Sequence, residues 1–278
     1  MKSILITGAS TGIGYATARH FDQLGWRVFA GVRKEADAQR LREASSTRLT
    51  PLMLDVTHSE QVATALAQVR EAVGDHGLDA LVNNAGIAVG GPVEYVPLER
   101  WRRQFEVNVF GVVAVTQAAL PLLRQARGRI VNISSVSGLI AAPFFGPYAA
   151  SKFALEALSD SLRLEVAPQG IRVILIEPGA VATPIWEKGR QEAQTLREHL
   201  PPEGMQWYGR LVARMERWIA ASERNAMPVE HVVRVIEEAV AAPRPKPRYV
   251  VARGASRFAP LMRCLPTALR DTLFKRLG

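Results

Sequence analysis

Short, nearly unbroken apolar runs recur along the chain, separated by longer segments of helical pattern. The runs are "SILIT" (3–7), "RVFAGV" (27–32), "LTPLML" (49–54), "DALVNN" (79–84), "RIVNIS" (129–134), "RVILIE" (172–177) and "RYVV" (248–251). Unbroken apolar strands are typical of a parallel sheet, which is buried on both faces and connected through helices. The pattern predicts an α/β fold with a doubly wound, seven-stranded parallel sheet.

The net charge of +9 is not spread evenly along the 278 residues. Residues 243–278 hold nine Lys or Arg and a single acid, so this basic tail carries +8 of the total. The body is nearly neutral, and nucleic-acid binding is therefore not expected.

Cysteine and histidine usage excludes several kinds of site. Cys264 is the only cysteine, which rules out an intrachain disulfide or a cysteine-based zinc site and fits a reducing cytoplasm. The five histidines show no metal-ligand spacing, so no metal is expected. No run of eighteen apolar residues occurs, and we expect no membrane-spanning helix.

A glycine-rich turn, "TGASTGIG" (7–14), directly follows the first predicted strand. Glycines let a backbone approach a pyrophosphate closely, and a helix N-terminus favours its negative charge. An ordinary tight turn is the alternative. The predicted cofactor-binding residues of this turn are Gly8, Ser10, Thr11, Gly12, Ile13 and Gly14.

Tyr148 and Lys152 are four residues apart, thirteen positions after Ser135. On a helix, residues i and i+4 share a face, so the phenol and the ammonium can serve one small molecule. This pairing indicates proton transfer; a helical surface pair is the alternative. Ser134 and Ser137 compete with Ser135 for the serine's role.

Taken with "NNAG" (83–86), "SSVSG" (134–138), "YAASK" (148–152) and "EPG" (177–179), the glycine turn closely resembles the short-chain dehydrogenase/reductase family over residues 3 to about 185. The resemblance implies a Rossmann-like fold that binds a nicotinamide dinucleotide and transfers hydride between it and an alcohol or carbonyl. It implies a catalytic set of Asn108, Ser135, Tyr148 and Lys152. It selects Ser135 over its neighbours by the spacing to the tyrosine.

Each residue of this set has an expected task. Tyr148 exchanges a proton with the substrate oxygen, and Ser135 donates a hydrogen bond to it. Lys152 and the charged nicotinamide lower the pKa of the phenol, and Lys152 also binds the ribose hydroxyls. Asn108 holds a water linking Lys152 to solvent, unless it is simply a satisfied core amide.

The resemblance also extends the expected cofactor site. Beyond the glycine turn, Tyr148 and Lys152, it adds Asp55, Val56, Asn84, Ala85, Gly86, Pro178, Gly179 and Thr183. Asn83 is expected to tie the central strands together. Strand-end turns and helix capping are the structural alternatives for Asp55 and Thr183.

The second strand bears on the choice of cofactor. Enzymes that use NAD usually have an acid at its end, but here Val32 takes that position, followed by Arg33 and Lys34. An arginine attracts a 2′-phosphate, and Ser10 adds a further contact. The sequence therefore favours NADP; Glu35 and Asp37 leave NAD open.

The substrate is less constrained. The uncharged "GLIAAPFFGP" (138–147), with Trp186, Trp207 and Tyr208, predicts an apolar pocket, although these aromatic residues can equally pack on the fold. Residues 247–277 are similar to the C-terminal extensions of hydroxysteroid and retinol dehydrogenases. We expect a steroid-, retinoid- or lipid-like secondary alcohol or ketone. Small ketones, sugars, a 3-oxoacyl substrate and a non-catalytic nicotinamide sensor stay open.

These expectations divide the chain into a dinucleotide-binding catalytic domain (1–251), with a substrate lid at 183–226, and a basic amphipathic extension (252–278). Apolar residues recur every three or four positions from Phe258 to Leu277, and Pro266 should split the extension into two helices. Packing over the cleft is favoured over a membrane contact. A homodimer or homotetramer is expected through residues 97–126 and 146–168, as in the family.

Overall fold

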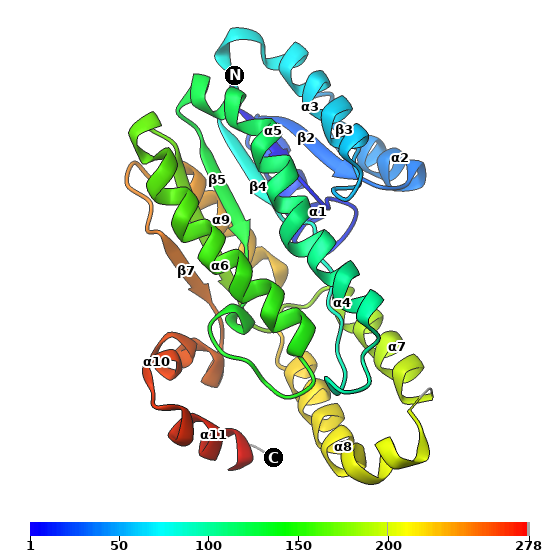
Figure 1. Ribbon diagram of the computed structural model, residues 1–278. Helices are drawn as coiled ribbons and strands as arrows, with labels where there is room; N and C mark the ends of the chain where they lie inside the picture. Colours follow the sequence, from blue (N-terminus) through cyan, green and yellow to red (C-terminus); the bar gives the residue numbers. More distant parts are fainter. Residues whose placement is uncertain (199, 277–278) are drawn as a thin grey trace.

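A single parallel sheet forms the centre of the molecule in the computed structural model, which describes residues 1–198 and 200–276 (Figure 1). The strand order is β3-β2-β1-β4-β5-β6-β7, which confirms the predicted fold. The strands are β1 (Ser3–Ile6), β2 (Arg27–Val32), β3 (Leu49–Met53), β4 (Ala80–Asn83), β5 (Arg129–Ile133), β6 (Arg172–Pro178) and β7 (Arg248–Val251).

Helices cover both faces of this sheet because successive strand residues point to opposite sides. Ile4 and Ile6 pack with α1 (Gly12–Gln23), α2 (Glu35–Ala44) and α9 (Val229–Ala241). Leu5 belongs to the opposite core, with α3 (Ser59–Val73), α5 (Gly111–Ala126) and α6 (Gly146–Val166). The nearly unbroken apolar strands are thus explained by burial on both faces.

The remaining helices connect or extend this framework. They are α4 (Leu98–Phe105), α7 (Ile185–Glu198), α8 (Pro202–Arg224), α10 (Ala259–Cys264) and α11 (Thr267–Arg276), with a π turn at Glu106–Phe110 and short 3₁₀ turns at Gly74–His76, Val136–Gly138, Ala167–Gln169 and Gly254–Phe258.

One helical run, Leu98–Ala126, is long and apolar enough to cross a membrane by length and composition, and half of that apolar stretch is buried in the protein. Val115, Ala119 and Leu122 of this run are fully or almost fully buried in the core shared with α3 and the sheet. The run is therefore a core helix of the fold.

The start of α3 differs from the capping box that "THSE" (57–60) suggests. The N-cap residue is His58, and the Thr57 hydroxyl instead donates a 2.8 Å hydrogen bond to Asp55 Oδ1. The carboxylate also accepts from the Thr57 amide at 3.0 Å. The helix begins one residue later than a capping box at Thr57 requires, so the Thr57 hydroxyl does not cap it.

The parallel register brings the carboxyl ends of β1, β4, β5 and β6 to one edge of the sheet. The strand order reverses between β1 and β4, where open α/β sheets bind their ligands. Asn83 ties this centre together: its side-chain amide donates to Asn132 Oδ1 at 2.9 Å and to Thr116 Oγ1 at 3.0 Å. The predicted role of Asn83 is confirmed.

Candidate active site

The glycine turn lies between β1 and α1. Gly8 and Gly12 have φ of 66° and 58°, in the left-handed region that favours glycine. A Cβ at Gly14 would collide with the carbonyl oxygen of Gly8. This backbone-lined cradle at a helix N-terminus fits a pyrophosphate. Ser10, Thr11 and Ile13 complete it, Thr11 as the N-cap residue of α1.

Asn84 fixes the cradle against β4. Its side-chain amide donates to the carbonyl oxygens of Thr7 and Gly8, both at 3.0 Å. The Thr7 hydroxyl in turn accepts from the backbone amides of Asn84 and Ala85 at 3.0 Å. Three of the predicted cofactor residues are therefore held together by hydrogen bonds, and Gly86 follows beside Asn108.

The adenosine end of the expected cofactor site carries an exposed cation. Val32 is buried at the end of β2, whereas the Arg33 side chain is 56% exposed and its Nη1 lies 4.0 Å from Asp55 Oδ2. The hydrogen bonds from Thr57 and the nearby Arg33 hold the pKa of Asp55 below its usual value, against the opposing effect of burial. Lys34 is exposed next to α2, and Val56 is buried against Gly111.

Glu35 and Asp37, the two acids that could favour NAD, have arginine partners on α2. Glu35 Oε1 lies 2.7 Å from Arg42, and Asp37 Oδ1 lies 2.9 Å from Arg40. Arg40 also donates to the carbonyl oxygen of Ser10. Arg40 is a residue that the sequence analysis missed, because its contact with the glycine turn spans thirty positions.

Ser135 lies just beyond β5 and is almost fully buried. Its hydroxyl donates to the carbonyl oxygen of Pro178 at a long 3.4 Å and accepts from the Ser137 amide at 3.1 Å. Ser134, the competing candidate, is also buried, and its hydroxyl faces Gly138 without a hydrogen-bond partner among the described residues. The hydroxyl of Ser135 is the one that reaches Tyr148.

Tyr148 and Lys152 lie on the first turns of α6. The Lys152 ammonium is 5.8 Å from the centre of the Tyr148 ring and donates a 2.7 Å hydrogen bond to the carbonyl oxygen of Ile133. Burial raises the pKa of Tyr148, and its hydrogen bond with Ser135 partly opposes the rise. The expectation that Lys152 and the charged nicotinamide together lower this pKa stays a prediction.

Asn108 lies in the π turn between α4 and α5 and is buried. Its Oδ1 accepts from the Ile87 amide at 2.9 Å, and its Nδ2 donates to Ile87 O at 3.0 Å and to Ser151 Oγ at 3.2 Å. Gln104 reaches the same Ser151 hydroxyl at 3.3 Å. The side chain of Asn108 is thus a satisfied core amide that pins the loop after β4 to α6, beside Lys152. Its water-holding role stays a prediction.

Thr183 closes the site from the side of β6. A Cβ at Gly12 would lie 3.2 Å from the Thr183 Cβ, so the segment after Gly179 lies against the glycine turn. The Gly179 amide donates to Val251 O at 2.9 Å. The structure therefore brings the predicted cofactor residues from β1, β4 and β6 to one edge.

The predicted lid, residues 183–226, forms α7 and α8 around position 199, which lies outside the described residues. Tyr208 of α8 donates to Glu94 Oε2 at 2.8 Å and packs edge-on against Tyr95. It also meets Phe144, whose φ of 66° is strained for a bulky residue. Helix α8 therefore packs across the two loops that flank Tyr148.

The other aromatic residues of the lid differ from the expected pocket lining. Trp207 is 74% exposed, and the Trp186 indole donates to the Val181 carbonyl oxygen at 2.7 Å. Trp218 packs against Phe145. Trp207 lies on a different side of α8 from the packed Tyr208 and faces solvent, so it lines no pocket.

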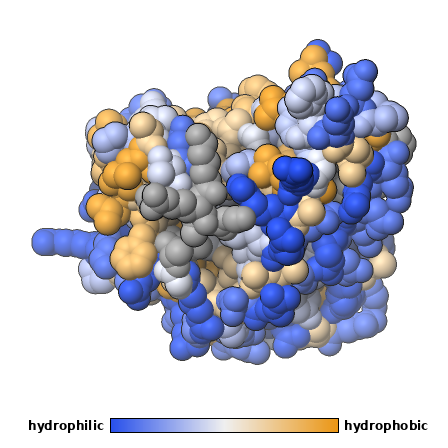
Figure 2. Space-filling view, turned by 90° about the horizontal axis from the view of Figure 1, so that it is seen from below, coloured by the Kyte–Doolittle hydropathy of each residue, from blue (hydrophilic) through white to orange (hydrophobic). Residues whose placement is uncertain are grey.

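The basic extension forms two short helices, α10 and α11, on either side of Pro266, as predicted. Three residues of its apolar stripe are partly exposed: Phe258, Leu261 and Leu269 are 48%, 64% and 49% exposed. Figure 2 shows apolar surface on the side of this face where α10 lies. Packing of the tail over the cleft stays a prediction. Leu277 lies outside the described residues.

Comparisons with known proteins agree with this geometry. A family model described as short chain dehydrogenase matches residues 2–194. The NADPH-dependent 3-dehydrocapnine reductase of Ornithobacterium rhinotracheale is 37% identical over 279 residues, covering 99% of this chain and 96% of the relative. The 17-beta-hydroxysteroid dehydrogenase type 6 of Bos taurus is 38% identical over 284 residues, covering 99% of this chain and 88% of the relative.

A solved structure is similar over nearly the whole chain as well. It is that of a short-chain dehydrogenase from Streptomyces avermitilis, with a TM-score of 0.77 and 29% sequence identity. The match covers 99% of this chain and 94% of the other.

Proposed function

Because the chain belongs to the short-chain dehydrogenase family, it is a nicotinamide-dependent oxidoreductase acting on hydroxyl and keto groups, and we propose that it uses NADP and an apolar secondary alcohol or ketone. The observation that carries the choice of cofactor is the exposed Arg33 after a buried Val32. The position where a carboxylate would bind a ribose hydroxyl is apolar, and a guanidinium stands next to it.

The charges on α2 support the same choice. Glu35 and Asp37 are paired with Arg42 and Arg40, and a ribose hydroxyl would have to compete with these arginines for either carboxylate. The relative from Ornithobacterium rhinotracheale is named as NADPH-dependent. Binding of a 2′-phosphate by Arg33 would add a charge-assisted contact that NAD cannot make.

Tyr148 and Ser135 are the polar groups that act on the substrate oxygen. The bound dinucleotide supplies or accepts the hydride. Tyr148 exchanges the proton with the substrate oxygen, and Ser135 donates a hydrogen bond to the same oxygen. The bond from Ser135 to Pro178 is long at 3.4 Å, so the hydroxyl can exchange this weak acceptor for a developing alkoxide.

The apolar substrate is supported by the surfaces around Tyr148. The loop at 139–146 bears no charged side chain, and Phe144, Tyr95 and Tyr208 form an aromatic cluster beside it. Such surfaces bind apolar ligands with few polar anchors. The relatives are named for 3-dehydrocapnine and 17-beta-hydroxysteroids. A steroid-, retinoid- or lipid-like substrate fits these observations.

The proposal extends to assembly and location. Exposed apolar side chains on the two predicted interface segments favour a homodimer: Phe110 is 56%, Phe153 38% and Leu164 68% exposed. A tetramer is the larger alternative. We place the protein in the cytoplasm, consistent with the single free Cys264.

A screen of apolar alcohols and ketones with both cofactors tests the proposal through the absorbance of the reduced nicotinamide. We expect turnover with NADP or NADPH and apolar substrates, and weak turnover with NAD. A clear preference for NAD would contradict the cofactor assignment. Turnover confined to small polar substrates would contradict the substrate assignment.

A further inference from the structure

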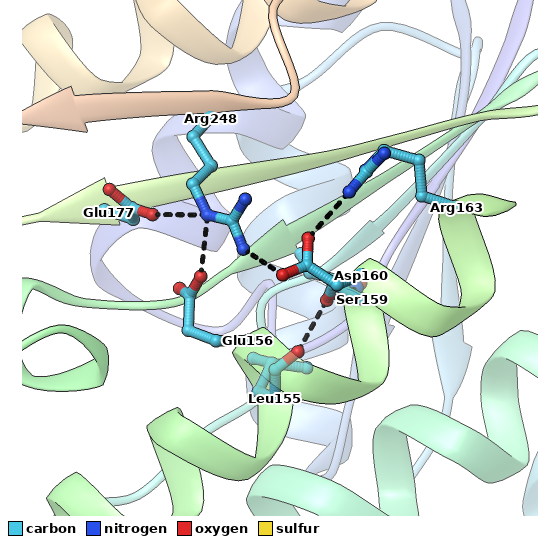
Figure 3. A network of polar contacts seen from close by, with 8 residues as sticks. Leu155, Glu156, Ser159, Asp160, Arg163, Glu177 and Arg248 are labelled. Carbon is cyan, nitrogen blue, oxygen red and sulfur yellow. Dashed lines mark hydrogen bonds and ion pairs between the residues drawn. The ribbon is translucent and has the colours of Figure 1, made fainter.

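A cluster of charged side chains is centred on Arg248 of β7 (Figure 3). Its Nε lies 3.1 Å from Glu156 Oε2 and 3.3 Å from Glu177 Oε1, and its Nη2 lies 2.7 Å from Asp160 Oδ2. Glu156 and Asp160 belong to α6, and Glu177 belongs to β6. One guanidinium therefore links the edge of the sheet to the helix that carries the candidate catalytic pair.

The three carboxylates differ in burial. Glu156 and Glu177 are 3% and 1% exposed, whereas the Asp160 side chain is 41% exposed. Glu156 Oε1 and Glu177 Oε2 have no hydrogen-bond partner among the described residues, and Glu177 Oε1 has only its ion pair with Arg248. A buried carboxylate is costly without a counter-charge, and the single charge of Arg248 is shared among three acids. A second cation near Glu156 would lower this cost.

Lys152 is placed to supply this second positive charge near Glu156. It precedes Glu156 by four residues on α6, which puts the two side chains on one helix face, and it is only 6% exposed. Gly138 abuts both residues: a Cβ there would lie 3.0 Å from Glu156 Cγ and 3.2 Å from Lys152 O. Burial lowers the pKa of Lys152 to about 8, and the charge of Glu156 opposes this fall.

We propose that Glu156 is a positioning residue for Lys152: held by Arg248, its buried carboxylate keeps the Lys152 ammonium charged and seated beside Tyr148. The consequence for catalysis rests on the proposed function, since that function gives the ammonium its task. The charge state of Lys152 can be tested whether or not the proposed function is correct.

Other charged groups surround this pair. Tyr148 faces Lys152 from the preceding turn of α6. Beyond Glu156 lie Arg248 on β7, Asp160 on α6 and Glu177 on β6, and Arg263 of α10 acts on Glu177. Among them, Glu156 is the carboxylate that directly opposes the fall in the pKa of Lys152.

Lysine titration by NMR tests the proposal directly. The full chain has six lysines, so ¹³C-labelled lysine gives few signals, and the one missing in Lys152→Arg identifies Lys152. We expect Glu156→Gln to lower the titration midpoint of Lys152 by about one pH unit or more, and Glu156→Asp to restore most of it. Asp160→Asn is the matched control, because it removes another carboxylate from Arg248 one turn further from Lys152 and should leave the midpoint unchanged.

An unchanged midpoint in Glu156→Gln, or an equal shift in Asp160→Asn, would overturn the proposal. If Glu156→Gln does not fold, the wild-type protein decides: a Lys152 midpoint of about 5–6, as documented for buried lysines, would show that no counter-ion acts on it. NADPH binding, measured by fluorescence in the same samples, distinguishes a failure of this proposal from a failure of the proposed function. A wild-type protein that binds no NADPH would contradict the proposed function and leave the lysine result standing.

Discussion

The ammonium of Lys152 donates a 2.7 Å hydrogen bond to the carbonyl oxygen of Ile133, the last residue of β5. This contact anchors α6 to the sheet at the edge where the candidate catalytic residues meet. The side chain of Lys152 is thus part of the fold and of the expected site at once.

Lys152→Ala should therefore reduce both turnover and dinucleotide affinity, and also lower stability. It leaves the Ile133 carbonyl oxygen without its buried partner, which costs about 1–3 kcal/mol. Denaturant unfolding and NADPH titration measure the two effects. A variant with normal dinucleotide affinity and impaired turnover alone would contradict the double role.

Arg33→Ala should weaken NADP binding by about 1.5–3 kcal/mol, the range for a hydrogen bond to a charged group, and leave NAD binding unchanged. The guanidinium is exposed and 4.0 Å from its nearest carboxylate, so its removal should not disturb the fold. Arg70→Ala, which removes an exposed arginine of α3, is the control. Equal losses for both cofactors would show that Arg33 does not bind the 2′-phosphate.

Most of the sheet could be predicted because burial on both faces leaves an unbroken apolar run for each strand. The predicted strand at 27–32 agrees with β2, and the one at 248–251 agrees with β7. The glycine turn and the motif residues could also be predicted, because they follow strand ends, and the parallel register brings those ends to one edge of the sheet.

Contacts between distant segments could not be predicted in this way. Arg248 and Glu156 are 92 positions apart, and neither belongs to a recurring local pattern. The exposure of Trp207 depends on which side of α8 meets the loops near Tyr148. The capping box at Thr57 was wrong because the helix takes His58 as its N-cap residue, one position later.

The stability of the protein should fall as pH rises through the titration of Glu177. Burial and the adjacent Glu156 raise the pKa of Glu177 to about 7 from its ordinary 4.5. The folded protein thus binds this proton more tightly than the unfolded chain, so stability is lost between about pH 4.5 and 7. Glu177→Gln mimics the protonated form and should remove this loss, which amounts to about 3 kcal/mol at most.

Urea unfolding at pH 5 and pH 8 measures this difference. Glu71→Gln, which neutralises an exposed carboxylate on α3, is the matched control and should retain the wild-type pH dependence. The same loss of stability between the two pH values in Glu177→Gln and in the wild type would contradict the assignment.

Phe110→Glu should convert the expected homodimer to a monomer. The side chain is 56% exposed on the face formed by the long helical run at 98–126, and a charge there would be buried at the interface. Light scattering gives the mass directly. Leu24→Glu, at an exposed position outside the expected interface, should remain dimeric. A monomeric wild type at micromolar concentration would refute the dimer.

The central claim is that the Tyr148 phenol exchanges the proton with the substrate oxygen while NADP is held by other groups. The most direct measurement compares the wild type with Tyr148→Phe, recording carbonyl-dependent oxidation of NADPH and the NADPH dissociation constant in the same samples. We predict that Tyr148→Phe lowers kcat by about 10²–10⁴-fold and leaves the dissociation constant nearly unchanged. Turnover close to that of the wild type in Tyr148→Phe would contradict the account.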